Sequence, residues 1–176
     1  GPLAELAGYF SDACWTDQSD LMRRYPNATA LVFLKRTQPL SESERAPGPP
    51  DLTDASLLGA CYLLRGKDAS GEEVLVVRGI NPRERVIERY DVGSFVEGLF
   101  DDVVVPYARA LGIEKVVVPF DELGHAQTNR QLINEHMLSR YADAQYVPLD
   151  EKDVLLNFNE RMIFNKCRLV RFVPQG

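Results

Sequence analysis

The sequence holds few side chains suited to moving a proton near neutral pH. His125 follows Gly124 in a segment between two predicted elements, and histidine is the side chain whose ordinary pKa lies in that range. Glu122 precedes it closely, and the phenol of Tyr141 lies on the helix predicted next. A base and an acid of these types suit general acid–base chemistry, so Glu122, His125 and Tyr141 are the candidate catalytic residues. The alternative that His125 is a surface histidine without a catalytic role stays open.

A second candidate chemistry is thiol hydrolysis at Cys14. The pair Cys14-Trp15 is similar to the Cys-Trp start of a papain-like catalytic helix, with His125 as a distant base and Asn129 or Asp121 as the group that orients it. Cys14 also continues an apolar stripe of helical spacing, formed with Leu3, Leu6 and Phe10. The stripe equally favours a small core residue at this position, so both interpretations remain.

The clearest predicted helix runs from Ser94 to Leu111. Ser94 and Glu97 have the spacing of a capping box at its start. Apolar residues follow at steps of three and four, namely Val96, Leu99, Phe100, Val103, Tyr107 and Leu111. Gly112 is placed to cap the end, and Pro106, which lacks an N–H, predicts a kink.

The turn that leads into this helix, from Arg89 to Ser94, is a candidate anion site. The first N–H groups of a helix have no partner within it and carry the positive end of its dipole. Three arginines gather before the helix in an otherwise acidic chain, at Arg83, Arg85 and Arg89. The simpler alternative is a capped helix start that binds nothing.

The remaining elements form an α/β pattern. We predict two short N-terminal helices in 3–15 and 21–25, then strands at 29–34, 57–64 and 73–78, of which the last two form a hairpin. A parallel crossover strand at 113–118 follows the long helix. A second capping box at Thr128–Gln131 opens a helix with one apolar face, made of Ile133, Met137, Leu138 and Tyr141. Terminal strands are predicted at 146–147, 154–158 and 162–172, and the proline-rich segment 37–52 is predicted to be a loop that folding does not need.

This order of elements resembles the GCN5-related N-acetyltransferase family over roughly residues 16–173. The resemblance implies one domain, with N-terminal helices at 1–28 and an acetyltransferase-like core at 29–176. It implies a mixed, mostly antiparallel central sheet with helices on both faces. In that family the strands before and after the long helix splay apart, acyl-coenzyme A lies in the gap, and the turn into the helix holds its pyrophosphate. The corresponding parts here are 74–79, 94–111 and 115–120.

The resemblance also implies a function and a site. The function is transfer of an acyl group from acetyl-coenzyme A or another acyl-coenzyme A to an amine of a small molecule or protein. The implied cofactor-binding residues are Val76, Val77, Arg78, Arg89, Val92, Gly93, Ser94 and Asn129. The family turn reads Gln or Arg, two residues, Gly, one residue, then Gly or Ala. This sequence keeps Arg89 and a small residue at Ser94 but has Val92 where the first glycine belongs, so a catalytically degenerate scaffold or interaction module is the alternative.

Composition narrows the class of protein. The chain has 176 residues and a formal net charge of −6, which disfavours a broad nucleic-acid or anionic-membrane surface. No apolar run approaches the length of a membrane-spanning helix. The 3 cysteines lack the paired spacing of a disulfide framework or a zinc site. We therefore expect a cytoplasmic protein without a metal, and a protein partner or homodimer remains open.

Overall fold

The three meandering strands predicted first are present and lie side by side. The computed structural model describes residues 28–34, 57–120, 124, 126, 128, 130–150 and 167–175. Strands β1 (Ala28–Leu34), β2 (Leu57–Lys67) and β3 (Glu73–Pro82) are antiparallel neighbours. The β2–β3 turn is fixed by Asp68, whose carboxylate accepts from the N–H groups of Ser70 at 3.0 Å and Glu72 at 2.9 Å.

Strand β4 (Lys115–Pro119) is parallel to β3, as predicted. The two strands pair over Val74–Val76 and Lys115–Val117 alone, although β3 continues to Pro82. β3 also bulges: Tyr62 of β2 faces Arg78, whereas Ala60 faces Asn81. The bulge contains Gly79, whose φ of 66° favours glycine. β3 and β4 therefore begin as a pair and then diverge.

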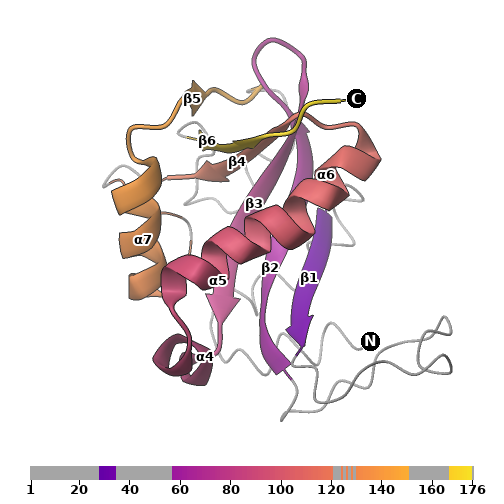
Figure 1. Ribbon diagram of the computed structural model, residues 1–176. Helices are drawn as coiled ribbons and strands as arrows, with labels where there is room; N and C mark the ends of the chain where they lie inside the picture. The colour runs from indigo at the N-terminus through magenta and orange to yellow at the C-terminus, as the bar shows by residue number, and fades with distance from the viewer. Residues whose placement is uncertain are drawn as a thin grey trace, which may run out of the picture.

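One long helical segment connects β3 to β4 and lies across one face of the sheet (Figure 1). It consists of α5 (Val92–Leu99), η2 (Phe100–Val104) and α6 (Val105–Leu111). It starts two residues before the predicted position, because Asp91 is the N-cap. The predicted capping box at Ser94 and Glu97 is therefore wrong. Ser94 donates to the cap instead, and Gly112 ends the segment in the left-handed conformation, as predicted.

A π-helical turn interrupts this segment at η2, directly before the predicted kink at Pro106. A π turn adds one residue, which rotates everything after it by about 100° around the axis. The buried residues after Phe100 are consequently Val104 and Ala108, while Val103 is exposed. The apolar face predicted through Val103 and Tyr107 is shifted by one position.

The second crossover helix, α7 (Gln131–Tyr141), buries Ile133, Met137 and Tyr141, but Leu138 is exposed, contrary to the predicted face. Its N-cap is Arg130, without a capping side chain, so the predicted box at Thr128–Gln131 is also wrong. Two strands follow, β5 (Tyr146–Val147) and β6 (Cys167–Phe172). A short helix that was not predicted, α4 (Glu84–Arg89), lies between β3 and α5.

Within the described residues the sheet has six strands in the order β1-β2-β3-β4-β6-β5, and β3 and β4 are the neighbours in it that run parallel. Residues of α5, η2, α6 and α7 share one core with one face of β2, β3 and β4. The α/β class with a mixed, mostly antiparallel sheet is thus confirmed. The predictions for helices in 3–15 and 21–25, for the loop 37–52 and for a strand at 154–158 lie outside the described residues. No helix in the described ranges is long and apolar enough to cross a bilayer.

Candidate functional site at the end of strand β3

The predicted cofactor-binding residues of β3 lie where β3 and β4 separate. Val77 belongs to the core beneath the helices, so Val76 and Arg78 point to the opposite face of the sheet. Arg78 is only 3% exposed, and its cross-strand neighbour is Tyr62. Burial raises the pKa of Tyr62 to about 12, although the positive charge of Arg78 acts in the other direction and lowers this pKa. Since Val76 and Val77 are fully buried, the groups that these two residues offer a ligand are those of the backbone.

The connection from β4 to α7 returns to β3 across this opening. Ala126 forms a bridge with Phe120 at the end of β4. The hydroxyl of Thr128 donates to the carbonyl of Ile80. Arg130 then donates from Nε to the carbonyl of Pro82 at 2.8 Å and to Oδ1 of Asn81 at 2.9 Å. The outer end of the strand opening is therefore bridged by side chains that precede α7.

The guanidinium of Arg130 is hydrogen-bonded through one of its three nitrogens, and the other two make no hydrogen bond within the described residues. Both of its hydrogen bonds use Nε. Within the described ranges, the terminal nitrogens Nη1 and Nη2 contact no acceptor and no carboxylate pairs with them. Sequence reasoning missed this residue, although its place directly before an apolar helical repeat was visible.

The turn into α5 is closed by the protein's own acid. Oδ2 of Asp91 accepts from the N–H and from the hydroxyl of Ser94, each at 2.8 Å. Both hydrogen bonds lower the pKa of Asp91, and the bond from the backbone N–H has the larger effect. A carboxylate thus sits where the predicted pyrophosphate would bind the helix start. The side chain of Val92 packs against the core, so Asp91 rather than Val92 obstructs the turn.

His136 of α7 covers the same turn from the other side. A Cβ built on Gly93 would lie 3.2 Å from Cε1 of His136 and 3.4 Å from Oδ2 of Asp91. Nε2 of His136 is buried, lies 3.7 Å from Oε2 of Glu97 and has no hydrogen-bond partner among the described residues. Arg89, the predicted charge partner of the turn, is exposed in the last turn of α4.

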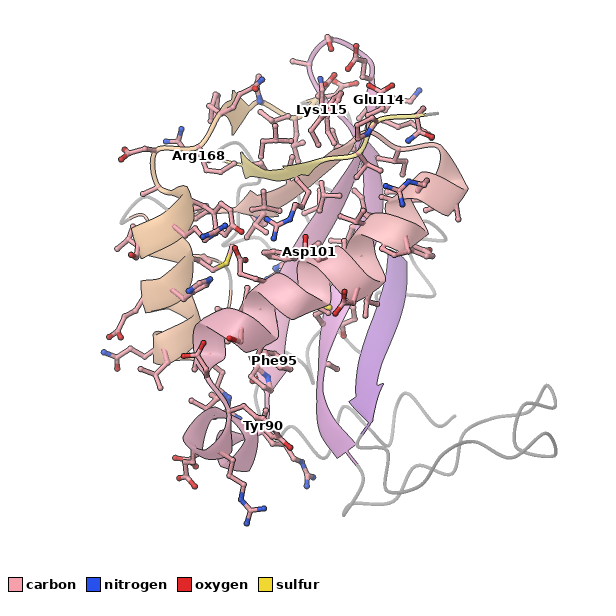
Figure 2. The ribbon with its side chains drawn as sticks, viewed as in Figure 1. Tyr90, Phe95, Asp101, Glu114, Lys115 and Arg168 are labelled. Carbon is pink, nitrogen blue, oxygen red and sulfur yellow. The ribbon has the colours of Figure 1, made fainter. Side chains whose placement is uncertain are left out.

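Tyr141 belongs to a polar cluster at the other end of α7. Its hydroxyl donates to the carboxylate of Glu97 at 2.6 Å and accepts from Nη1 of Arg171 at 2.8 Å. Burial, followed by the bond to Glu97, raises the pKa of Tyr141. Arg171 also pairs with Asp101 at 2.7 Å, and Figure 2 shows Asp101 on the long helix. Tyr141 lies about 15 Å along the helix axis from Gln131, away from the strand opening.

The other candidate residues divide into two groups. Glu122, His125 and Asn129, together with Cys14 and Asp121 of the thiol-hydrolase alternative, lie outside the described residues. The thiols of Cys61 and Cys167 are buried, and burial raises both pKa values, which disfavours a nucleophilic role for either. In the part of the chain that the structure describes, no group of His, Cys, Asp and Glu could hold a metal ion.

A hollow of about 400 Å³ lies at the opposite end of the sheet, between the β2–β3 turn and β5. Its one lysine, Lys115, pairs with Asp68 at 2.8 Å and with Glu72 at 2.7 Å. Figure 2 shows Lys115 at the far end of the molecule from Tyr90 and Phe95, which lie where α4 meets α5. The lysine charge is already balanced, so the hollow offers an anion little.

The starts of α5 and α7 therefore differ in charge, because α5 is capped by the carboxylate of Asp91 and α7 begins next to the guanidinium of Arg130. Comparison of the chain with protein-family models, with curated proteins and with solved structures finds no match.

Proposed function

We propose that the protein binds acyl-coenzyme A between β3 and β4 and transfers the acyl group to an amine, in the manner of the GCN5-related N-acetyltransferases it resembles. One observation carries the proposal: the parallel strands β3 and β4 pair over three residues each and then diverge, with a long helix crossing between them. The diverging strands and the crossover helix are the features that the resemblance associates with acyl-coenzyme A.

The backbone of β3 supplies the groups that such a ligand needs. Beyond Val76, β3 has no ladder partner in β4, so its amide and carbonyl groups on that side are open to the amides of an extended ligand. The Thr128 hydroxyl occupies one of these groups, the carbonyl of Ile80. A single neutral hydrogen bond contributes about 1 kcal/mol. This contact would weaken binding of a ligand about fivefold without preventing it.

Acyl transfer also requires an amine that has lost its proton. The proposal assigns this step to Glu122 or His125, which follow β4 in the sequence. Tyr141 is a poor donor to a leaving thiolate, because its proton is directed to Glu97 and its pKa is raised. The acceptor is an amine-bearing small molecule or protein. A reducing cytoplasmic setting suits the buried thiols of Cys61 and Cys167.

A second function, a catalytically degenerate scaffold that binds a protein partner, is favoured by the carboxylate of Asp91. An acid that already caps α5 competes with a pyrophosphate at the same N–H groups. The two functions differ in whether acyl-coenzyme A binds at all.

Calorimetric titration with acetyl-coenzyme A tests the proposal, together with release of free thiol in the presence of a polyamine or a lysine peptide. We expect saturable binding with a Kd below about 1 mM and acceptor-dependent thiol release. Thr128→Val should tighten binding severalfold because it releases the carbonyl of Ile80, whereas Thr128→Ser, which keeps the hydroxyl, should not. Absence of binding by the wild type and by Thr128→Val would refute the enzyme and leave the scaffold.

A further inference from the structure

Among the half-buried arginines of the described ranges, Arg130 is the one whose two terminal guanidinium nitrogens have no partner. Arg171 pairs with Asp101 and with Glu97. Arg168 donates to the carbonyl of Ala144 and lies over the ring of Tyr146. Arg130 makes its two bonds through Nε, to Asn81 and to Pro82, and these fix the side chain without neutralising it.

Among the residues that the structure describes, no carboxylate pairs with the charge of Arg130. The β3 end contributes a carbonyl and an amide oxygen. On α4, the carboxylates of Glu84 and Glu88 are exposed and form no ion pair with Arg130. On α7, Glu135 accepts from the side chain of Gln131 at 3.0 Å. A planar guanidinium that is fixed in place and lacks a carboxylate is suited to bind an oxyanion through two parallel hydrogen bonds.

The start of α7 adds to the same positive field. Arg130 is the N-cap residue of this helix, and its own side chain makes no capping hydrogen bond. Among the described residues, no side chain accepts from the N–H groups of the first turn, in contrast to the start of α5. A phosphate carries more charge and more acceptor oxygens than a carboxylate, so this combination favours phosphate.

We propose that Arg130 is a binding residue for a phosphate or pyrophosphate group of a ligand, and that this group binds at the start of α7 rather than at the turn into α5. The inference deepens the proposed function, because it would place the phosphate end of acyl-coenzyme A beside Asn81 and Pro82. It rests on that function only for the identity of the ligand. The phosphate site itself does not require that the ligand be coenzyme A.

The probe is inorganic pyrophosphate, titrated at low ionic strength into the full chain, with acetate as the carboxylate comparison. We expect Arg130→Ala to weaken pyrophosphate binding roughly tenfold to a hundredfold, the range of a charge-assisted contact. Arg130→Lys should recover only part of the loss, because lysine keeps the charge but not the fork. Arg89→Ala tests the rival site at the turn into α5 and should change binding less than about twofold. Added salt should weaken wild-type binding.

Several results would overturn the inference. One is wild-type protein that does not bind pyrophosphate, and another is acetate that binds equally well. A third is a loss of binding in Arg89→Ala but not in Arg130→Ala, which would return the site to the α5 turn. Arg130→Lys decides the matter if Arg130→Ala fails to fold. Pyrophosphate binding that depends on Arg130, combined with no binding of acetyl-coenzyme A, would uphold this site and reject the proposed function.

Discussion

The helices α5 and α7 both follow a strand of the parallel pair, yet their N-termini treat charge in opposite ways. At α5, Asp91 supplies a carboxylate that accepts from Ser94, and His136 covers the turn from α7. At α7, Arg130 is the N-cap residue and brings a cation instead of an acceptor. The same backbone dipole is therefore neutralised in one helix and reinforced in the other. Of the two helix starts, the one at α7 is therefore the one that we propose for an external anion, since at α5 the chain supplies its own carboxylate.

The contact between the two helices holds these N-termini in place, and Glu97 is its centre. Glu97→Ala leaves the hydroxyl of Tyr141 without its acceptor and removes one of the two carboxylates that pair with Arg171. We expect a loss of about 2 kcal/mol in the free energy of unfolding, measured by urea denaturation. Glu135→Ala, which removes an exposed partner of Gln131 on the same helix, should cost less than about 0.5 kcal/mol. Equal losses would mean that the cluster does not couple α5 to α7.

Asp91 is the next contact to remove. Asp91→Ala deletes the acceptor for the N–H of Ser94, and loss of an N-cap lowers the melting temperature of a small domain by roughly 3 °C. Asp91→Asn keeps a good cap without the charge and should restore most of the loss. An Asp91→Ala variant with the melting temperature of the wild type would show that the carboxylate does not stabilise the start of α5.

The stabilisation by Asp91 should also depend on pH in one direction. Hydrogen bonds from Ser94 lower the pKa of Asp91 in the folded protein, so the folded state prefers the charged form. The contribution is complete above the unfolded pKa of about 4 and is lost as pH falls through the lower folded pKa. The melting temperatures of wild type and Asp91→Ala should therefore converge as the pH falls progressively below about 4. A difference that stays constant as the pH falls would show that the charge of Asp91 is not involved.

The smallest expected effect concerns the packing of His136 on Gly93. Alanine at 93 gains helix propensity but brings a Cβ within 3.2 Å of His136. We expect Gly93→Ala to be near neutral alone and to stabilise the protein by about 0.5 kcal/mol once His136→Ala removes the contact. Unfolding curves of both single variants and the double variant measure this coupling. Purely additive effects would mean that His136 does not cover the turn.

The sequence predicted the larger elements of the fold but not their details. The hairpin and the β3–β4 crossover follow from apolar runs and turn residues that local chemistry determines. The π turn at η2 was not predictable from spacing, because Val103 and Val104 are identical in type and only packing decides which is buried. Both capping boxes failed because the chain makes other contacts. Asp91 accepts from Ser94 and caps α5. The hydroxyl of Thr128 donates to the carbonyl of Ile80 and accepts from the N–H of Arg130, which is itself the N-cap residue of α7.

The candidate site was predicted in part. The resemblance implied that the strands on either side of the long helix separate, and β3 and β4 do pair over only three residues each. The anion site that it implied at Arg89 stays a prediction. The relevant contacts join Arg130 to Asn81 and Pro82, which are distant in sequence. No spacing rule links residues so far apart, and the open fork of Arg130 becomes visible only when its bonds are counted.

The most direct test of the account is the change in backbone amide NMR signals when acetyl-coenzyme A is added to the labelled protein. We predict that the signals that move belong to β3 beyond Val76, to Thr128 and Arg130, and to the first turn of α7. The signals of Ser94 in the capped turn and of Asp68 beside the far hollow should stay unchanged. Spectra without any change at millimolar ligand, or changes confined to Ser94 or to Asp68, would contradict the account.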